Sequence, residues 1–264
     1  RQIVALGHDC EVVAPSLIPR KVGERVKTDR RDARALARLS RAGELTAVWV
    51  PEPEQEAMRD LTRAREDMKA LELKARQRLG AFLLRHGRVY RGKSRWSQAH
   101  FRWLETVRFE APVQQVVLAE YLEAVRHAQR QVAGLEAQMR EALESWSLRP
   151  MVEGLMALRG VSLITAMTTL AELGDITRFD APRKLMAYLG LIPSEHSTGP
   201  SRRQGAITRT GNGHVRRLLI EAGWQYQHLA RKSRDIQRRA ERTSPRIQAI
   251  AWRRRSACAG ATGA

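Results

Sequence analysis

Two long stretches of the chain place apolar residues at every third or fourth position, with charged residues between them. In residues 54–85 the apolar positions are Met58, Leu61, Ala64, Met68, Leu71, Ala75, Leu79 and Phe82. In residues 113–145 they are Leu118, Leu122, Val125, Val132, Leu135, Met139 and Leu143. This spacing predicts two long amphipathic helices, and its heptad-like seam favours an antiparallel coiled-coil hairpin with a loop at residues 86–95. Core packing is the simpler explanation of the stripes, while the surplus arginines on the other faces are available to nucleic acid.

The residues before the first long helix mix extended and helical patterns. The run CEVVAPSLIP, residues 10–19, is rich in valine and is interrupted by two prolines, which favours a short strand. Short strands do not form a stable sheet alone, so we expect the last strand of a larger α/β unit. From Thr28 the pattern predicts an amphipathic helix with a threonine cap, acidic residues in its first turn and Gly43 at its end. Residues 46–55 then predict an extended linker.

The last third of the chain predicts shorter helices joined by glycine-containing turns. Residues 155–173 predict two helices with a tight turn at Gly160. This resembles a helix-hairpin-helix, in which backbone N–H groups of the turn receive a phosphate, although any helical hairpin can use glycine there. Residues 182–229 predict a helix, a loop and a helix. Residues 253–264 are low in complexity and lack apolar periodicity, which predicts a disordered tail.

Charge narrows the class of partner. The 264 residues include 47 Lys and Arg against 28 Asp and Glu, for a formal net charge of +19. An excess of this size indicates a polyanionic partner, and the bias towards arginine suits bidentate contacts with phosphate. Nucleic acid fits better than a membrane surface, because no apolar run approaches the roughly 20 residues that span a bilayer.

Cysteine usage and the first residue bound the setting of the chain. Cys10 and Cys258 lie at opposite ends without a paired spacing, which argues against a zinc site or a disulfide framework and favours a reducing cytoplasm. We therefore expect a cytoplasmic protein without a signal peptide. Because the chain begins with Arg1, we expect it to start inside a longer protein.

The stretch YLGLIPSEHSTGPSRRQGAITRTGNGHVRRLL, beginning at Tyr188, carries the most informative chemistry. It places the hydroxyls of Ser197 and Thr198 in a glycine-rich loop among arginines. A hydroxyl nucleophile that attacks a phosphodiester needs such a loop, with fixed cations nearby to stabilise the transition state. A loop that only grips phosphate has the same composition, and composition alone favours that simpler reading.

Acidic and histidine residues supply weaker candidates. Asp29 and Asp32 lie three apart on one face of the predicted helix, where two carboxylates can hold Mg²⁺. Acids in a first turn also complement the helix dipole and pair with nearby arginines, which is the simpler explanation. His196 is adjacent to Ser197 and lacks an evident acid to orient it, so a hydrolase triad is discounted. His214 lies on a predicted helix, where phosphate contact or packing is expected.

Several motifs occurring in one order resemble a known family, the insertion-sequence-110 type transposases with their 1111 subgroup. The motifs are KTDRRDA, LRGVSLITAMTTLAELGDITRF, YLGLIPSEHSTG and RRQGAITRTGNGHVRRLLIEAGW. The segments WVPEPEQEAMRDLTRAREDMK and AFLLRHGRVYRGK are similar to the family's central helical region. The resemblance covers residues 12–252.

The resemblance implies a RuvC-like, RNase H-type domain with a DEDD set of metal-binding acids, a coiled-coil segment and a domain with a catalytic serine. It implies that Asp29 and Asp32 are the last two acids of DEDD, binding Mg²⁺. It implies that the nucleophile lies in HSTG, where Ser197 is preferred and Thr198 remains an alternative. The serine would form a covalent phosphoserine linkage with DNA, guided by a structured non-coding bridge RNA.

The same resemblance implies a prokaryotic, nucleoid-associated protein with further partners. The chain differs from the family's pattern at both of its ends. A homo-oligomer that binds insertion-sequence ends and target DNA is expected, with nucleic-acid contacts from Gly160, Arg202, Arg203, Arg209, Asn212, His214, Arg216 and Arg217. The family's first Asp and its Glu precede the residues present here, and RRRSACAGATGA replaces the usual continuation at the other end. We therefore expect a truncated copy that is inactive alone.

Together these observations predict a mainly α-helical protein with four regions. Residues 1–45 would be the end of the RuvC-like α/β domain, 52–150 the helical coiled-coil region, 151–252 the serine transposase domain and 253–264 the tail. The expected function is DNA transposition or site-specific recombination. A non-catalytic nucleic-acid-binding protein and a RuvC-like metal-dependent nuclease are the alternatives.

Overall fold

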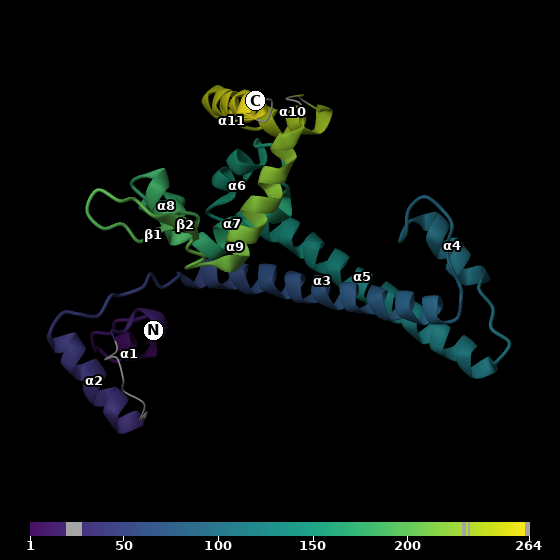
Figure 1. The fold of residues 1–264 in the computed structure, drawn as a ribbon, viewed down its shortest axis with the longest axis horizontal. Coiled ribbons are helices and arrows are strands. Elements are labelled where there is room, and N and C mark those ends of the chain that lie inside the picture. Colours follow the sequence, from purple (N-terminus) through teal and green to yellow (C-terminus); the bar gives the residue numbers. More distant parts are fainter. Residues whose placement is uncertain (20–27, 229–230, 232, 262–264) are drawn as a thin grey trace. The chain divides into compact units, whose positions relative to one another are not determined.

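The computed structural model describes residues 1–19, 28–228, 231 and 233–261. It divides into two compact units, Arg1–Glu52 and Pro53–Ala264. Both units are dominated by helices (Figure 1). The prediction of a mainly α-helical protein is therefore confirmed.

In the first unit, helix α2 (Asp29–Arg41) follows the short helix α1 (Gln2–Ala5) and the 3₁₀ turn η1 (Pro15–Leu17). Helix α2 begins where the sequence predicts, because the Thr28 hydroxyl accepts a hydrogen bond from the Arg31 N–H at 3.3 Å. After the helix ends, Gly43 adopts a positive φ of 67°, a conformation that glycine reaches without strain.

The strand expected at residues 10–19 is not formed. Among the described residues of this unit, β-type pairing is limited to an isolated antiparallel bridge between Val13 and Ala47. Pro15 instead opens η1, because its fixed φ suits the first position of a helical turn. The described residues of this unit therefore contain no strand of the expected α/β domain.

The second unit is built on two long helices, α3 (Pro53–Arg85) and α5 (Pro112–Ser145), which pack side by side in opposite directions (Figure 1). Their bounds agree with the predicted 54–85 and 113–145. A short helix between them, α4 (Gln98–Thr106), was not predicted. Ser97 caps it by accepting a hydrogen bond from the His100 N–H at 3.4 Å.

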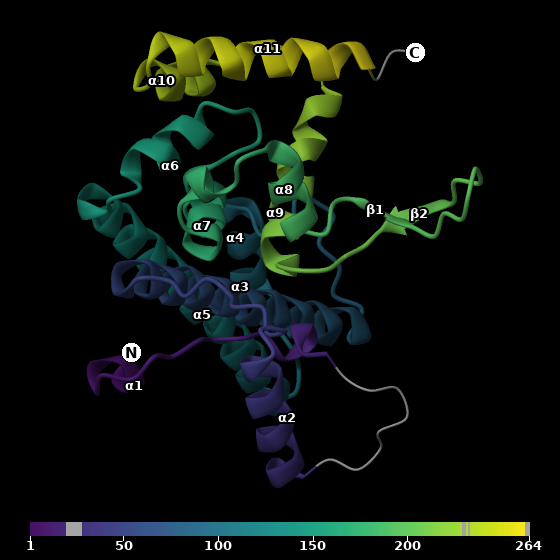
Figure 2. The ribbon, with the colours of Figure 1, turned by 90° about the vertical axis from the view of Figure 1, so that its left-hand side faces the viewer.

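Shorter helices cover the other end of the α3–α5 pair: α6 (Arg149–Met156), α7 (Leu163–Leu173), α8 (Pro182–Tyr188), α9 (Gly213–Gly223), α10 (Arg234–Glu241) and α11 (Pro245–Ala261), with 3₁₀ turns η2 (Ile176–Arg178) and η3 (Trp224–Gln227). Helix α7 is the central one, and every residue from Ala166 to Leu173 is buried. Its apolar side chains share a core with residues of α3, α5 and α6, including Met58, Met139, Val152, Met167 and Leu170. Figure 2 shows α7 between α6 and α9, above α3.

A two-stranded antiparallel hairpin extends from α8 and α9 (Figure 2). Strand β1 (Pro193–Glu195) pairs with β2 (Gln204–Ile207) in the register Pro193 with Ile207 and Glu195 with Gln204, with an irregularity between them. The sequence predicts only a loop here, because strands this short and exposed show no apolar alternation. We call residues 190–211 the arm.

The C-terminal tail also differs from the prediction. Helix α11 continues to Ala261, whereas residues 253–264 were predicted to be disordered. Alanine has the highest intrinsic helix propensity, and the segment SACAGA contains three alanines, so a helix already begun can continue through it.

Shortening a side chain at the centre of this core should destabilise the second unit. Leu170 is fully buried on α7, so Leu170→Ala leaves a cavity and should lower the free energy of unfolding by about 3 kcal/mol. Urea denaturation followed by circular dichroism measures this loss. The matched control is Leu71→Ala on α3, at a side chain that is 48% exposed, which should change stability by less than about 0.5 kcal/mol. Equal losses in both variants would contradict a core centred on α7.

Candidate catalytic arm and its anchor

The Ser197 side chain lies just beyond strand β1 on the exposed arm and makes two hydrogen bonds. Its Oγ donates to Glu195 Oε1 at 2.8 Å and accepts the Arg203 backbone N–H at 3.2 Å. These contacts fix the hydroxyl from both sides of the hairpin. The Glu195 carboxylate also lies within hydrogen-bond distance of the Ser197 hydroxyl, as a general base must.

Glu195 is the residue of this group that the sequence prediction missed. Its other carboxylate oxygen accepts from Gln204 Nε2 at 3.3 Å, and Arg202 Nε lies 3.7 Å from Oε1. The hydrogen bond from Ser197, then that from Gln204, and more weakly the charge of Arg202 lower the pKa of the Glu195 carboxyl and together outweigh desolvation, which raises it. The carboxylate is therefore ionised at neutral pH. Its spacing of two residues from Ser197, which places both on one face of a strand, was the available signal.

Thr198 occupies a different place, at the tip of the arm. Its backbone N–H donates to the Ser201 carbonyl at 3.1 Å, and the Ser201 N–H donates back at 3.2 Å. Between them Gly199 turns the chain with a φ of 59°, a conformation that glycine adopts readily. The tip is thus a tight two-residue turn, and the serine, unlike the threonine, has a side-chain hydrogen bond to a carboxylate.

The base of the arm is closed by contacts that leave no space for larger residues. A Cβ on Gly211, where φ is 71°, would come within 1.9 Å of the Tyr188 carbonyl oxygen. A Cβ on Gly190 would meet the backbone of Thr210 at 2.4 Å. Arg216 Nη1 then donates to the carbonyls of Leu189 and Thr210, at 2.8 and 2.9 Å, and so joins the two sides of the base.

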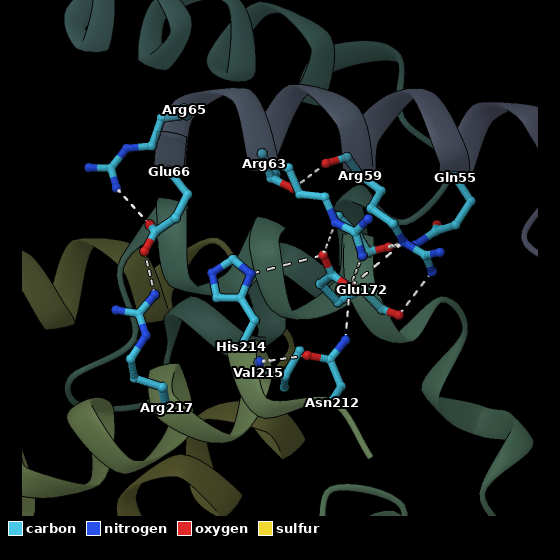
Figure 3. A network of polar contacts seen from close by, with 12 residues as sticks. Gln55, Arg59, Arg63, Arg65, Glu66, Glu172, Asn212, His214, Val215 and Arg217 are labelled. Carbon is cyan, nitrogen blue, oxygen red and sulfur yellow. Dashed lines mark hydrogen bonds and ion pairs between the residues drawn. The ribbon is translucent and has the colours of Figure 1, made fainter. Parts of the chain in front are cut away.

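Asn212 connects the base of the arm to the protein core. Its Oδ1 accepts the Val215 N–H at 3.0 Å and caps α9, while its Nδ2 donates to Glu172 at 2.8 Å (Figure 3). Glu172, near the end of α7, is only 3% exposed. The start of α9, and with it the end of the arm, is therefore held by a buried carboxylate.

Helix α3 supplies the countercharge to that carboxylate. Arg63 donates to both oxygens of Glu172, at 2.7 and 3.0 Å, and Arg59 Nε lies 3.8 Å away (Figure 3). Arg59 also donates to the Ala171 and Glu172 carbonyls at 3.2 and 3.0 Å, and Gln55 donates to the Ala171 carbonyl at 2.7 Å. Cationic and amide donors thus satisfy carbonyls at the C-terminus of α7, where the helix dipole favours positive charge.

The environment of Glu172 has opposing effects on its pKa. Burial acts most strongly and by itself raises the pKa of the carboxyl. The hydrogen bonds from Arg63 and Asn212, with the charges of Arg63 and Arg59, together outweigh burial and hold the pKa below its ordinary value of 4.5. Glu172 therefore stays ionised at neutral pH.

The structure separates the residues predicted to contact nucleic acid into two groups. Arg202, Arg203 and Arg209 are exposed on the arm. The polar groups of Asn212, His214, Arg216 and Arg217 instead face protein: His214 Nδ1 lies 3.9 Å from Glu172, and Arg217 pairs with Glu66 of α3 and Glu221 of α9. Only Glu172 is buried among these groups, and Arg217 is 48% exposed. These contacts give the four side chains partners within the protein, and their contact with nucleic acid stays a prediction.

Gly160 also has a packing role that the sequence did not indicate. It adopts a φ of 78°, and a Cβ there would approach the Ala222 carbonyl to 2.3 Å and the Gln225 side chain to 2.9 Å. The turn between α6 and α7 therefore lies against the end of α9. This close approach by itself requires glycine at the position, and a phosphate contact by the turn stays a prediction.

Asp29 and Asp32 both lie in the exposed first turn of α2. They offer the hard oxygen donors that Mg²⁺ prefers. Among the residues that the structure describes, no group of three or more His, Cys, Asp or Glu side chains is placed to hold a metal ion. Two carboxylates suit the ion chemically but are fewer than the ligands of a closed site.

No helix in the described ranges combines the length and the apolar character needed to cross a bilayer. Comparison with known proteins gives two family matches. The family model described as "Transposase IS116/IS110/IS902 family" matches residues 152–238, and DEDD_Tnp_IS110, described as a transposase, matches residues 4–87. The first match runs from within α6 to within α10 and includes the arm, and the second covers α2 and all of α3.

Three relatives extend the likeness over most of the chain. The chain is 48% identical to "Putative transposase y4qE" of Sinorhizobium fredii over 96% of its own length and 62% of that protein. It is 30% identical to the transposase for insertion sequence element IS1533 of Leptospira borgpetersenii, over 95% of this chain and 73% of the relative. The transposase for IS1111A of Coxiella burnetii is 24% identical over 83% of this chain and 60% of its own length. The chain thus spans roughly two thirds of the length of these relatives.

Removing the charge of Glu172 should weaken folding in a pH-dependent way. Glu172→Gln leaves Arg59 and Arg63 without their buried partner, so the free energy of unfolding at pH 7 should fall by about 3 kcal/mol. Because the folded-state pKa of Glu172 is lowered, its stabilisation is present above about pH 4.5 and is lost as the pH falls through the folded-state value. Urea denaturation from pH 7 to pH 3 should therefore show a smaller decline for Glu172→Gln than for the unmodified chain.

The matched control is Glu120→Gln, at an exposed position on α5. It should leave both the stability at pH 7 and its decline in acid close to those of the unmodified chain. If Glu120→Gln and Glu172→Gln behaved alike, Glu172 would not anchor α3, α7 and α9.

Proposed function

This chain belongs to the IS116/IS110/IS902 family of transposases, and we propose that it catalyses DNA transposition with Ser197 as the nucleophile. The observation that carries the proposal is the 2.8 Å hydrogen bond from Ser197 Oγ to the ionised Glu195 carboxylate. A serine hydroxyl is a weak nucleophile until an adjacent base takes its proton. Thr198 remains the alternative nucleophile, and its place in the tip turn makes it the weaker candidate.

The proposed step conserves atoms and charge. Glu195 accepts the Ser197 proton as Oγ attacks a DNA phosphorus, so a phosphorus–Oγ bond forms and the bond from phosphorus to one deoxyribose oxygen breaks. The departing oxygen takes a proton from solvent. The DNA strand is then held on the protein as a phosphoserine ester, which a second deoxyribose hydroxyl can attack in the reverse direction to reseal a strand.

The arginines of the arm supply the countercharge that this step requires. Arg202, Arg203 and Arg209 are exposed on the same hairpin as Ser197. Charge develops on the phosphoryl oxygens in the transition state, and fixed guanidinium groups stabilise it. An exposed arm also suits a substrate as large as a DNA duplex, which a closed pocket does not admit.

The same proposal includes a bound Mg²⁺ ion and a structured bridge RNA that guides the protein to DNA. Asp29 and Asp32 would hold Mg²⁺ with further oxygen ligands, and a bound ion would offset phosphate charge. A RuvC-like arrangement of α2 and a coiled-coil role for α3 and α5 follow from the family resemblance. The charge of +19 supports binding of both DNA and a structured bridge RNA, and recombination between two duplexes favours a homo-oligomer.

The nucleophile is tested by looking for the covalent intermediate. Because Asp29 and Asp32 are only part of the metal-binding set that the family resemblance implies, the chain is first extended at its N-terminus with the segment of a relative that carries the remaining acids. The extended chain is incubated with Mg²⁺, labelled DNA carrying the element's ends and RNA transcribed from the flanking DNA, and adducts are resolved on a denaturing gel. The chain with Ser197 should form a protein–DNA adduct and Ser197→Ala should form none, because the substitution removes the hydroxyl that is hydrogen-bonded to Glu195. Thr198→Val, which keeps the shape at the neighbouring position, should retain the adduct.

Two outcomes would contradict this proposal. Nucleic-acid binding without an adduct from the extended chain with Ser197 would indicate a non-catalytic binding protein. Mg²⁺-dependent cutting that survives Ser197→Ala but is lost in Asp29→Asn or Asp32→Asn would indicate a metal-dependent nuclease.

The base is tested by the rate of adduct formation. Glu195→Gln keeps the size of the side chain and a hydrogen-bond acceptor but removes the ability to take a proton. The rate should fall by about 100-fold, and Glu195→Asp should restore part of it. An unchanged rate in Glu195→Gln, measured at equal DNA occupancy, would show that another group accepts the Ser197 proton.

A further inference from the structure

A hollow of about 530 Å³ lies between the last turns of α3, residues 86–97 and α4. Helix α4, which supplies part of its lining, lies at the end of the α3–α5 pair opposite to α7 (Figure 1). Its volume falls within the range of roughly 300–1,000 Å³ that is usual for ligand sites. We call it the distal pocket, and neither Ser197 nor the Glu172 network contributes to its lining.

Aromatic rings form one wall of the distal pocket. The chain has six tryptophans and four tyrosines, and three of these ten, Tyr90, Trp96 and Trp103, line it with His100. The His100 and Trp103 rings lie nearly parallel with centroids 5.6 Å apart, and Tyr90 lies 4.7 Å from His100 and 5.4 Å from Trp103. The rings therefore form one connected surface against which a flat ligand can stack.

The polar atoms of this wall are oriented by a specific contact. The Trp96 backbone N–H donates to His100 Nδ1 at 3.0 Å, so the neutral ring carries its proton on Nε2. Burial first, and the charge of Arg95 second, lower the pKa of His100, which keeps the ring neutral. The Nε2–H group is a donor for a carbonyl or ring nitrogen of a ligand.

Trp96 is held in an unusual backbone conformation to make this wall. Its φ is 64°, in a region of backbone conformation that bulky residues avoid because it is strained. Its ring lies perpendicular to that of His100 with centroids 5.1 Å apart, and the Arg76 guanidinium lies 5.2 Å from its centroid. Strain of this kind persists where the surrounding contacts fix a side chain in place.

Cations surround the aromatic wall and select the charge of the ligand. Arg76, Arg88 and Arg95 contribute to the lining, which contains no acidic residue among the described side chains. The connecting segment HGRVYRGKSR, residues 86–95, carries four Lys and Arg residues and no Asp or Glu. The ligand should therefore combine a flat apolar group with negative charge beside it.

We propose that the distal pocket binds an unstacked base of single-stranded nucleic acid, with Arg88 and Arg95 contacting the flanking phosphates. Bases in a duplex are stacked on one another and cannot enter, whereas unpaired bases stack readily on aromatic side chains. An apolar peptide would leave the arginines unmatched. Binding here requires nothing of the arm, so Ser197→Ala should leave it unchanged even if the proposed transposition chemistry fails.

Two substitutions that each add a negative charge at an exposed valine test the site without removing core side chains. Val89 lines the pocket and is 52% exposed, and Val116 on α5 is 60% exposed and outside it. Fluorescence anisotropy with short single-stranded RNA and DNA oligonucleotides, and with a duplex competitor, measures the dissociation constant. Val89→Glu should weaken single-strand binding by about tenfold or more, whereas Val116→Glu, which adds the same charge, should change it less than about twofold.

Stacking is tested with a tryptophan pair and by photocrosslinking. Trp103→Ala should weaken single-strand binding by about tenfold, and Trp224→Ala, at a 63% exposed side chain of η3, should not. RNA carrying 4-thiouridine or DNA carrying 4-thiothymidine should crosslink to a peptide containing Tyr90, Trp96 or Trp103. The oligonucleotide with the higher crosslinking yield identifies RNA or DNA as the preferred strand.

Three results would overturn the proposal. Equal affinities for Val89→Glu and Val116→Glu, or crosslinks confined to other segments, would show that the pocket holds no base. Tighter binding of duplex than of single-stranded oligonucleotides would also show that the pocket holds no unstacked base. A dimer in sedimentation that Val89→Glu converts to monomer, with nucleic-acid affinity unchanged, would show instead that a second copy covers the pocket.

Discussion

The arrangement of the second unit depends on one buried carboxylate and the cations that neutralise it. Glu172 sits near the end of α7 and is contacted by Arg59 and Arg63 from α3 and by Asn212 before α9. A carboxylate in this position is costly unless every partner is present. The same charge that would disfavour burial therefore specifies which helices must meet, and in which register.

This anchor explains how an exposed hairpin can still have a defined origin. Asn212 caps α9 and binds Glu172, Arg216 joins the two sides of the base, and Gly190 and Gly211 allow the backbones to cross closely. Beyond this base the arm is stabilised by its own hydrogen bonds, including those of Ser197 and Glu195. The base of the arm is therefore held by several contacts while its tip is accessible, which suits a nucleophile that must reach the backbone of a large substrate.

Much of the helical architecture could be predicted from local patterns, because long amphipathic periods and caps are properties of neighbouring residues. The bounds of α3 and α5, and the cap of α2 at Thr28, agree with the structure. The strand near Val13 was wrong, since a proline-opened 3₁₀ turn replaced it. The arm was missed because strands of three and four exposed residues have no apolar alternation to reveal them.

The site residues divide in the same way. Ser197 is predicted from its motif, but the role of Glu172 depends on Arg63 and Asn212, which lie 109 and 40 residues away in the sequence. No local pattern contains that information, so the packing contacts of Arg216 and Gly160 could not be predicted from the sequence, while their predicted contacts with nucleic acid stay predictions.

The central claim is that Ser197 becomes covalently joined to DNA. The most direct measurement is mass spectrometry of the chain, extended at its N-terminus with a relative's segment that supplies the remaining acids, after incubation with element DNA, nuclease digestion and trypsin cleavage, applied to the peptide of residues 185–202. The account predicts a residual nucleotide phosphate localised by fragmentation to Ser197. Localisation to Thr198, or an unmodified peptide under conditions in which the DNA ends are cut, would contradict it.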